Sequence, residues 1–397
     1  MYNRTTYVDP NKGICGHETV GYGGTDELTP LFGEVVLSVA YRHRSAKSRQ
    51  VSMHLRGPMN VSQLAVYQLP GDMHTLQKRH TVPFYNRQRA TEKRKTNTKK
   101  LLQQSALAKP SHRRTLTVTS EPNEEPQGTP TTKQADTAPG RGSIRRAADW
   151  NRVAYYTSAS PADATGLSFL ANLGDPRKSG TFDYAFGNSL SYVSSNGGVV
   201  APESMPFDGT LATSEREIAV FSDKACDQDC PYWRPNATSH LGWAGSSKAF
   251  FIEFQMDHYQ NTGTDQGMIS DAPAWWFLNA AIPRILQYGS DRNNVPCSCW
   301  STGCGEFDAF EVLGKGEERA KSTLHRQGNL EGGDSNYFRR PVGRMLKFAV
   351  IWTFPNITAL VLDDDFDFSE SLSDDQIRQL VSYDPDSWVH SLFAIGD

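Results

Sequence analysis

The segment from Cys297 to Leu313 reads CSCWSTGCGEFDAFEVL and contains three closely spaced carboxylates. These are Glu306, Asp308 and Glu311. Side chains of a β-strand alternate between two faces, so Glu306 and Asp308 point the same way if this segment is a strand. Glu311 would point the other way unless the strand contains a β-bulge, an extra residue that is common beside active sites. We therefore predict a bulged strand that carries all three acids on one face.

A row of carboxyl groups on one face suits the cleavage of a glycosidic bond. That reaction needs one ionised carboxylate and one protonated carboxyl on either side of the reacting sugar carbon. The Cα atoms of the outer acids would lie about 13 Å apart, at roughly 3.3 Å per residue. Two glutamates leaning inward narrow that gap towards the roughly 5.5 Å of a retaining enzyme. Asp308 between them adds negative charge, which raises the pKa of the group that ionises least readily.

The triplet alone is a weak signal. The pattern E-x-D-x-x-E is expected by chance in about one chain in ten of this length. The alternative interpretation is therefore a solvated strand face, and the surrounding residues have to decide between the two.

Those surroundings resemble a known family. The letters EFDAFE are similar to the E-[ILV]-D-x-x-E signature of glycoside hydrolase family 16, and Pro273–Leu278 is similar to the P-A-x-W-x-L segment of that clan. The run Ala272–Leu313, together with Ala320–His325 and Gly332–Phe338, more closely resembles the fungal cell-wall "target of SBF" family of glycosyl hydrolases. The resemblance covers about residues 150–385.

The resemblance implies a fold and a set of roles. The fold is all-β, a concanavalin A-like jelly-roll sandwich. Glu306 matches the nucleophile, Asp308 the residue that tunes it, and Glu311 the acid/base of a double-displacement mechanism. The implied substrate is cell-wall β-1,3-glucan, and both hydrolysis and transfer to a second sugar hydroxyl remain open.

Several other side chains are candidates for contacts with a sugar. The candidates are Trp276, Trp300, His325, Asn279 and Gln287. Trp276 matches the cleft position and either stacks on a pyranose ring or fills the core, whereas Trp275 faces the other way and is expected in the core. Trp300 adjoins the acid-bearing strand. His325 either hydrogen-bonds a sugar hydroxyl or the nucleophile, or is an ordinary buried histidine.

Composition and short sequence motifs indicate the size of the domains and the cellular location of the protein. The chain has 397 residues with 38% hydrophobic and 11% aromatic side chains, which is enough for one large domain and a smaller one. No apolar run approaches the roughly 20 residues that span a bilayer. The chain begins without a signal peptide, yet it contains six cysteines and four N-glycosylation sequons, at Asn3, Asn60, Asn236 and Asn356. We expect a secreted, cell-wall protein whose true start is missing, glycosylated at Asn60, Asn236 and Asn356; a cytosolic protein with chance sequons is the alternative.

The cysteines favour disulfides over zinc. Their spacing lacks the paired C-x2-C pattern of structural zinc sites. We expect disulfides that rigidify the loop before Glu306, with pairing left open among Cys226, Cys230, Cys297, Cys299 and Cys304. No metal and no cofactor are expected.

Composition also divides the chain into three parts. Residues 1–83 contain two expected strands, Val51–Pro58 and Ser62–Tyr67, and resemble a remnant of the glycine-rich N-terminal domain of the family. That domain is interrupted by residues 35–50, which the family pattern lacks and which we interpret as translated intron. Residues 84–147 are rich in basic residues and then in Ser, Thr and Pro, which predicts a disordered linker.

Residues 148–397 form the predicted jelly-roll domain. Runs such as Lys248–Met256, Met345–Phe354 and Thr358–Leu362 are apolar and rich in β-branched or aromatic residues. A capping box at Ser373–Gln376 predicts one short C-terminal helix. This region has 18 basic and 33 acidic residues, a net charge of −15, which argues against nucleic acid as the partner of the basic linker.

Three classes of function follow. The first is a retaining glycosidase or transglycosidase that acts on β-glucan as a monomer, without a membrane partner. The second is a non-catalytic glucan-binding or structural cell-wall protein. The third, an interaction protein with a basic tail, is opposed by the acidic body of the chain.

Overall fold

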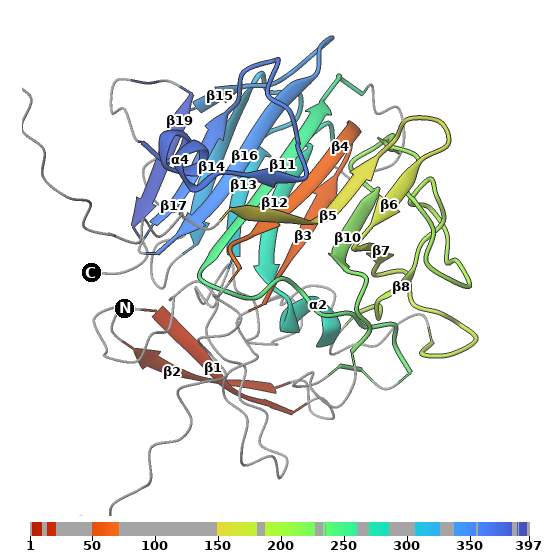
Figure 1. Ribbon diagram of the computed structural model, residues 1–397. Helices are drawn as coiled ribbons and strands as arrows, with labels where there is room; N and C mark the ends of the chain where they lie inside the picture. Colours follow the sequence, from red (N-terminus) through yellow and green to blue (C-terminus); the bar gives the residue numbers. More distant parts are fainter. Residues whose placement is uncertain are drawn as a thin grey trace, which may run out of the picture. The chain divides into compact units, whose positions relative to one another are not determined.

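The computed structural model describes residues 2–9, 14–20, 50–70, 149–180, 187–226, 233–234, 236–259, 270–285, 306–325, 337–354, 356–382, 387 and 389–394. The chain divides into two units, Met1–His80 with Ala147–Asp397, and Thr81–Arg146. All described residues belong to the first unit, which contains two stacked antiparallel sheets and few helices (Figure 1). Among these residues, no helix is long and apolar enough to cross a membrane.

The first sheet has eight strands. In spatial order they are β15 (Tyr337–Arg339), β14 (Arg319–His325), β13 (Glu306–Val312), β12 (Ala274–Asn279), β3 (Val51–Arg56), β10 (Glu217–Ser222), β7 (Leu167–Ala171) and β8 (Ser191–Tyr192). A short helix, α2 (Ala281–Ile285), follows β12. Neighbouring strands pair antiparallel. Because side chains alternate along each strand, each face of the sheet is built from about every second residue.

The second sheet has nine strands. Its main order is β18 (Ser371–Leu372), β5 (Trp150–Thr157), β4 (Met59–Gln68), β11 (Ser247–Gln255), β16 (Leu346–Thr353), β17 (Asn356–Val361) and β19 (His390–Ala394). The short strands β6 (Asp163–Thr165) and β9 (Thr210–Leu211) pair with β5 and β4. Separately, β1 (Tyr2–Asp9) and β2 (Ile14–Val20) form a two-stranded sheet.

The main core lies between the two large sheets. In β11 the predicted alternation is confirmed, since Phe250, Ile252 and Phe254 are buried in this core. Phe251, between them, belongs to a second cluster on the opposite side of the same sheet. The expected all-β sandwich is therefore the fold of the chain.

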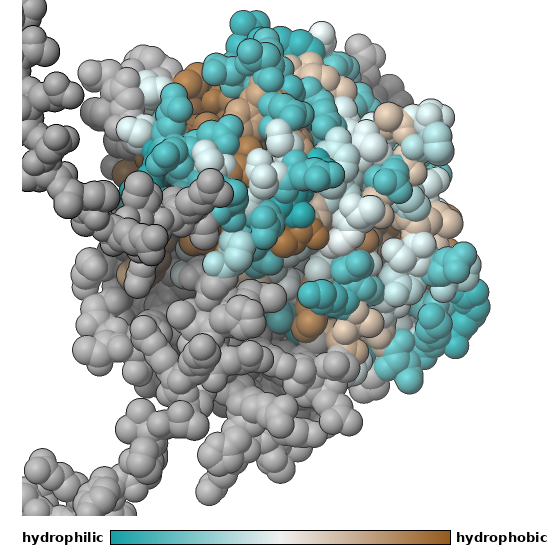
Figure 2. Space-filling view, viewed as in Figure 1, coloured by the Kyte–Doolittle hydropathy of each residue, from teal (hydrophilic) through white to brown (hydrophobic). Residues whose placement is uncertain are grey.

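The second apolar cluster covers the outer side of the nine-stranded sheet. Helix α4 (Asp374–Leu380) contributes Ile377 to it, and the predicted capping box is present, with Ser373 accepting from the backbone N–H of Gln376. Figure 2 shows hydrophilic residues over most of the described surface in this view, with hydrophobic residues between them at the upper left.

One predicted boundary is wrong. The strands expected in a separate N-terminal remnant, β3 and β4, are central strands of the two large sheets: β3 lies between β12 and β10, and β4 lies between β5 and β11. The physical reason is burial on both sides, since Val51, Leu55 and Leu64 fill the core while Tyr67 fills the second cluster. Residues 84–147 and 35–49 lie outside the described residues, so the linker and the insertion stay predictions.

The turn between these strands has a close approach at Gly57. A Cβ atom at this position would collide with the backbone carbonyl oxygens of Leu211 and Thr213. Glycine therefore lets β3 cross into β4 and pass from one sheet to the other beside β9.

Candidate active site

Strand β13 carries the three acids on its outer face. In the register with β14, Asp308 lies opposite Thr323 and Glu311 lies opposite Lys321, so β13 has one residue more than its neighbour. The intervening residues of β13 are buried in the main core; they are Phe307, Ala309, Phe310 and Val312. The predicted bulge is confirmed, and it turns Glu311 to the same side as Glu306 and Asp308.

The acids are crowded and poorly solvated, although they are not sealed. Burial, followed by the charges of Asp308, Glu311 and Glu217, raises the pKa of Glu306 well above its usual value. Burial and Asp308 raise the pKa of Glu311 to about 7, against the opposing effect of Arg56. The side chain of Glu311 nevertheless keeps 24% of its surface exposed, so a ligand can reach it.

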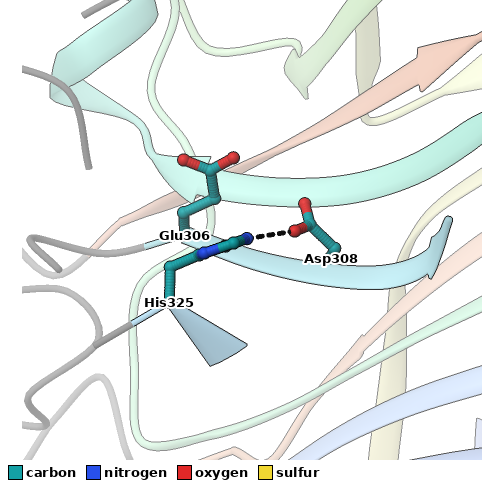
Figure 3. A group of neighbouring side chains, drawn as sticks. All are labelled: Glu306, Asp308 and His325. Carbon is teal, nitrogen blue, oxygen red and sulfur yellow. Dashed lines mark hydrogen bonds and ion pairs between the residues drawn. The ribbon is translucent and has the colours of Figure 1, made fainter. Parts of the chain in front are cut away.

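His325 is fixed against the middle acid. Its Nε2 donates to Asp308 Oδ2 at 2.6 Å, and both side chains are almost fully buried. Figure 3 shows this pair beside Glu306, with His325 on β14 and both acids on β13. The sequence left open a hydrogen bond to the nucleophile or to a sugar hydroxyl, or an ordinary buried histidine, and the structure gives His325 a hydrogen bond to Asp308. A contact with a sugar hydroxyl stays a prediction.

The same three residues are the group among the described ones that could hold a metal ion. Glu306, Asp308 and His325 each bring one donor atom within 4.8 Å of the others. The hydrogen bond between His325 and Asp308 already accounts for the proximity of two of them. The crowding therefore needs no ion to explain it.

Trp276 lies on the acid-bearing face, in register with Asp308 on one side and His54 on the other. The ring is 8% exposed. It stacks on the imidazole of His54 at 5.2 Å, and the guanidinium carbon of Arg56 lies 5.5 Å from its centre. Trp275 is fully buried in the core, as predicted. The small exposed part of Trp276 leaves its role in sugar stacking a prediction.

Three further residues were predicted to contact a sugar. Asn279 is 1% exposed and ends β12, one position after Leu278. Its assignment as a sugar-binding residue stays a prediction. Trp300 and Gln287 lie outside the described residues.

Two residues that the sequence reading missed come from β3. Arg56 Nη2 donates to Glu311 Oε1 at 3.2 Å, and Arg56 Nε donates to the carbonyl oxygen of Ala272 at 2.9 Å. Burial lowers the pKa of His54 to about 3, so this imidazole is neutral. The sequence did contain a signal for these two residues. Polar residues alternate in β3 with buried apolar ones, so that Ser52, His54 and Arg56 form one polar face.

The remaining predictions concern cysteines and sequons. Cys226 is disulfide-bonded, and Ser239 Oγ donates to its sulfur at 3.3 Å. The structure does not describe Cys230, Cys297, Cys299 and Cys304. Asn236 is exposed at a left-handed backbone position, whereas Asn60 and Asn356 are half-buried in strands. Glycosylation at these sites stays a prediction.

A comparison with protein families supports the resemblance noted above. Residues 148–380 match the family described as "Cell wall protein YJL171C/Tos1, C-terminal". The chain belongs to this family. Its members are described as cell-wall proteins, and the match contains all three acids of β13 and His325.

Individual relatives of this Tos1 family carry a functional name. A protein of Schizosaccharomyces pombe named a probable circularly permuted 1,3-beta-glucanase is 38% identical over 237 residues, which are 57% of this chain and 45% of the relative. The Saccharomyces cerevisiae protein "Probable circularly permuted 1,3-beta-glucanase TOS1" is 36% identical over 59% of this chain and 50% of its own length. This chain thus spans about half the length of these curated relatives.

One relative matches nearly the whole chain. A probable circularly permuted 1,3-beta-glucanase of Arthroderma benhamiae is 31% identical over 403 residues, which cover 94% of this chain and 84% of the relative. No solved structure gives a significant match. The match to the Tos1 family model begins at residue 148, so it does not include β3 and Arg56.

Proposed function

We propose that this chain is a retaining glycoside hydrolase or transglycosidase that acts on β-1,3-glucan of the fungal cell wall. The observation that carries the proposal is the bulge in β13, which brings Glu306, Asp308 and Glu311 to one partly exposed face. The names of the relatives support a glucan-acting hydrolase at the level of the family.

In this mechanism Glu306 is the nucleophile and Glu311 is the acid/base. Glu311 protonates the leaving oxygen while Glu306 attacks the anomeric carbon, and a glycosyl-enzyme forms. Glu311 then removes a proton from water, or from the hydroxyl of a second sugar, which displaces Glu306. Hydrolysis results in the first case and transglycosylation in the second.

The crowding of the site supports this division of labour. Both outer acids have raised pKa values, because burial and neighbouring carboxylates disfavour their ionised forms. Two such groups titrate as a coupled pair, so one proton is retained by the pair over a range of pH in which the other group is ionised. This singly protonated state is the one that a retaining glycosidase requires. His325 holds Asp308 in place between them.

The test is turnover of a soluble β-1,3-glucan. We expect the full chain, purified from a secreting host, to release a ladder of oligosaccharides from laminarin, and Glu306→Gln to abolish it. Proton NMR of the first product should show the β-anomer, because two displacements retain configuration. Products longer than the donor would identify transfer.

The control is Glu370→Gln, which changes an exposed carboxylate near β18 and should leave turnover unchanged. Absence of turnover in the wild-type chain would refute the enzymatic proposal. If laminarin were still bound in that case, the protein would instead be a non-catalytic glucan-binding protein of the wall.

A further inference from the structure

Arg56 lies in the middle of a charged row across the eight-stranded sheet. It is the cross-strand neighbour of Glu217 on β10 and of Ala274 on β12. Ala274 in turn lies opposite Glu311 on β13. The guanidinium group can therefore reach over the small side chain of Ala274 towards Glu311, and a larger residue at position 274 would obstruct that approach.

Three contacts fix the guanidinium group. Its Nη2 donates to Glu311 Oε1 at 3.2 Å, its Nε donates to the carbonyl oxygen of Ala272 at 2.9 Å, and its carbon lies 5.5 Å from the ring of Trp276. The side chain is only 14% exposed. A planar guanidinium group that is held through several of its donors fixes the orientation of the carboxylate it contacts. The ammonium group of a flexible lysine side chain does this less well.

We propose that Arg56 is a positioning residue of the active site, which orients the carboxyl group of Glu311 and supplies the nearest positive charge. This inference rests on the acid/base role of Glu311 under the proposed function. It extends the site to a strand that precedes the unit Thr81–Arg146, and so to a part of the chain outside the matched family region.

The charged and titratable groups around Glu311 show why Arg56 matters. They come from β13 itself, from the neighbouring strand β14, and from β3 and β10 beyond β12, and they are Glu306, Asp308, Lys321, His325, His54, Arg56 and Glu217. Three of these are carboxyl groups besides Glu311 itself. His54 is neutral because of its burial, and His325 is hydrogen-bonded to Asp308. Among the described residues, Arg56 is the cation in direct contact with Glu311.

The charge of Arg56 favours the ionised form of Glu311, and it therefore opposes burial and Asp308 in setting the pKa of this group. Removal of that charge should raise the pKa of Glu311. Because the acid/base must be protonated for the first step, the alkaline limb of the pH–rate profile should then move to higher pH. Loss of orientation should lower kcat separately.

The experiment compares Arg56→Gln and Arg56→Lys with Arg152→Gln in the full chain. Arg152 is a matched control, because it donates to the carbonyl oxygen of Phe368 and its guanidinium carbon lies 4.1 Å from the Tyr155 ring, but on the other sheet. We expect Arg56→Gln to lower kcat on laminarin by about ten- to a hundred-fold. We also expect its alkaline limb to move up by about one pH unit.

Arg56→Lys separates charge from orientation. It should return the alkaline limb close to its wild-type position while kcat stays lowered, because lysine keeps the charge without the fixed planar donors. Arg152→Gln should change neither quantity. A folded Arg56→Gln protein with wild-type kcat and pH profile would overturn the proposal, and so would equal behaviour of the glutamine and lysine variants.

A readout without turnover separates this inference from the proposed function. Carboxyl carbons of ¹³C-labelled glutamate titrate by NMR, and Glu311→Gln identifies the resonance of Glu311. If the wild-type chain releases no sugar but the Glu311 resonance titrates at higher pH in Arg56→Gln, the enzymatic proposal fails and the contact with Arg56 stands. An unchanged Glu311 titration in Arg56→Gln overturns the role of Arg56 whether or not the chain is active.

Discussion

The two outer faces of the sandwich are built from the same kind of strand but carry opposite chemistry. On the nine-stranded sheet the outer face is apolar, and Tyr67, Phe251 and Ile351 are buried with Ile377 of α4. On the eight-stranded sheet the corresponding face carries Glu306, Asp308 and Glu311 with Arg56 and His325. One sheet is therefore covered by apolar residues on both sides, whereas the other carries on its outer face a row of ionisable groups that is only partly exposed.

This difference separates stability from chemistry. Aromatic contacts on the apolar face, such as Phe251 with Phe366 at 5.5 Å, contribute to the stability of the fold. On the acid-bearing face, carboxyl groups with raised pKa values oppose folding at neutral pH, because their ionised forms are poorly solvated there. Substitutions on the two faces should therefore affect different measurements.

The largest effect is expected from the two outer acids. Glu306→Ala and Glu311→Ala should each lower turnover of laminarin by about 10³-fold or more. The two variants should give different products from an aryl β-1,3-oligoglucoside whose leaving group needs no protonation. Azide should restore reaction in both: as the direct attacker in Glu306→Ala, giving the α-glycosyl azide, and against the glycosyl-enzyme in Glu311→Ala, giving the β-glycosyl azide.

The anomeric configuration of the azide product, measured by NMR, checks this assignment. Glu370→Ala, which removes an exposed carboxylate from the other side of the sandwich, should retain wild-type activity. A β-azide from Glu306→Ala would reverse the two roles.

The next effect concerns the apolar face. Phe251→Ala should lower the free energy of unfolding by about 3–5 kcal/mol, since a fully buried aromatic side chain leaves a cavity among Tyr67, Phe366 and Phe368. Urea denaturation measures the loss, and Phe251→Leu provides a milder variant if the alanine protein does not fold. The pH–rate profile of the folded fraction should not move, and a shift would show that the faces are coupled.

A smaller effect concerns the pH dependence of stability, to which Glu217 on the acid-bearing face should contribute. Burial raises the pKa of Glu217 to about 7, with Arg56 opposing it. A carboxyl group whose pKa is raised in the folded state contributes stability that is fully present below its unfolded pKa and is lost as the pH rises through the folded value. Glu217 should therefore weaken the fold progressively between about pH 4.5 and pH 7.

Glu217→Gln removes this titration. The variant should be about as stable as the wild-type chain at pH 4.5 and more stable by about 1–3.5 kcal/mol at pH 8, the upper figure corresponding to the full shift of the pKa. Urea denaturation at the two pH values measures the difference. Equal stabilisation at both pH values would indicate a packing effect, and none at pH 8 would show that Glu217 is well solvated.

Much of this contrast could be read from the sequence. The E-x-D-x-x-E spacing predicted the bulge because only an extra residue brings Glu311 to the side of Glu306, and the alternation of Phe250, Ile252 and Phe254 predicted the core face of β11. Local capping chemistry predicted α4. These features depend on residues close together in the chain.

The features that could not be read depend on strand partners far apart in the chain. Nothing local to residues 51–68 shows that β3 and β4 are inserted between strands that follow residue 149. Arg56 was missed for the same reason, because its contact with Glu311 joins residues 255 positions apart. For His325 the sequence left two interpretations open, and its register opposite Glu306 places its Nε2 against Asp308.

The smallest effect tests how the apolar face is closed. Ser373 caps α4 by accepting from the backbone N–H of Gln376 at 3.1 Å, and α4 covers the sheet with Ile377. Ser373→Ala should lower the free energy of unfolding by about 1 kcal/mol, because one N–H at the helix start loses its acceptor. Ser371→Ala, at an exposed position of β18, should have almost no effect in the same urea titration. Because Ser373 lies on the side of the sandwich without the acids, its loss should leave the pH–rate profile unchanged, and a changed profile would mean that closure of one face is transmitted to the other.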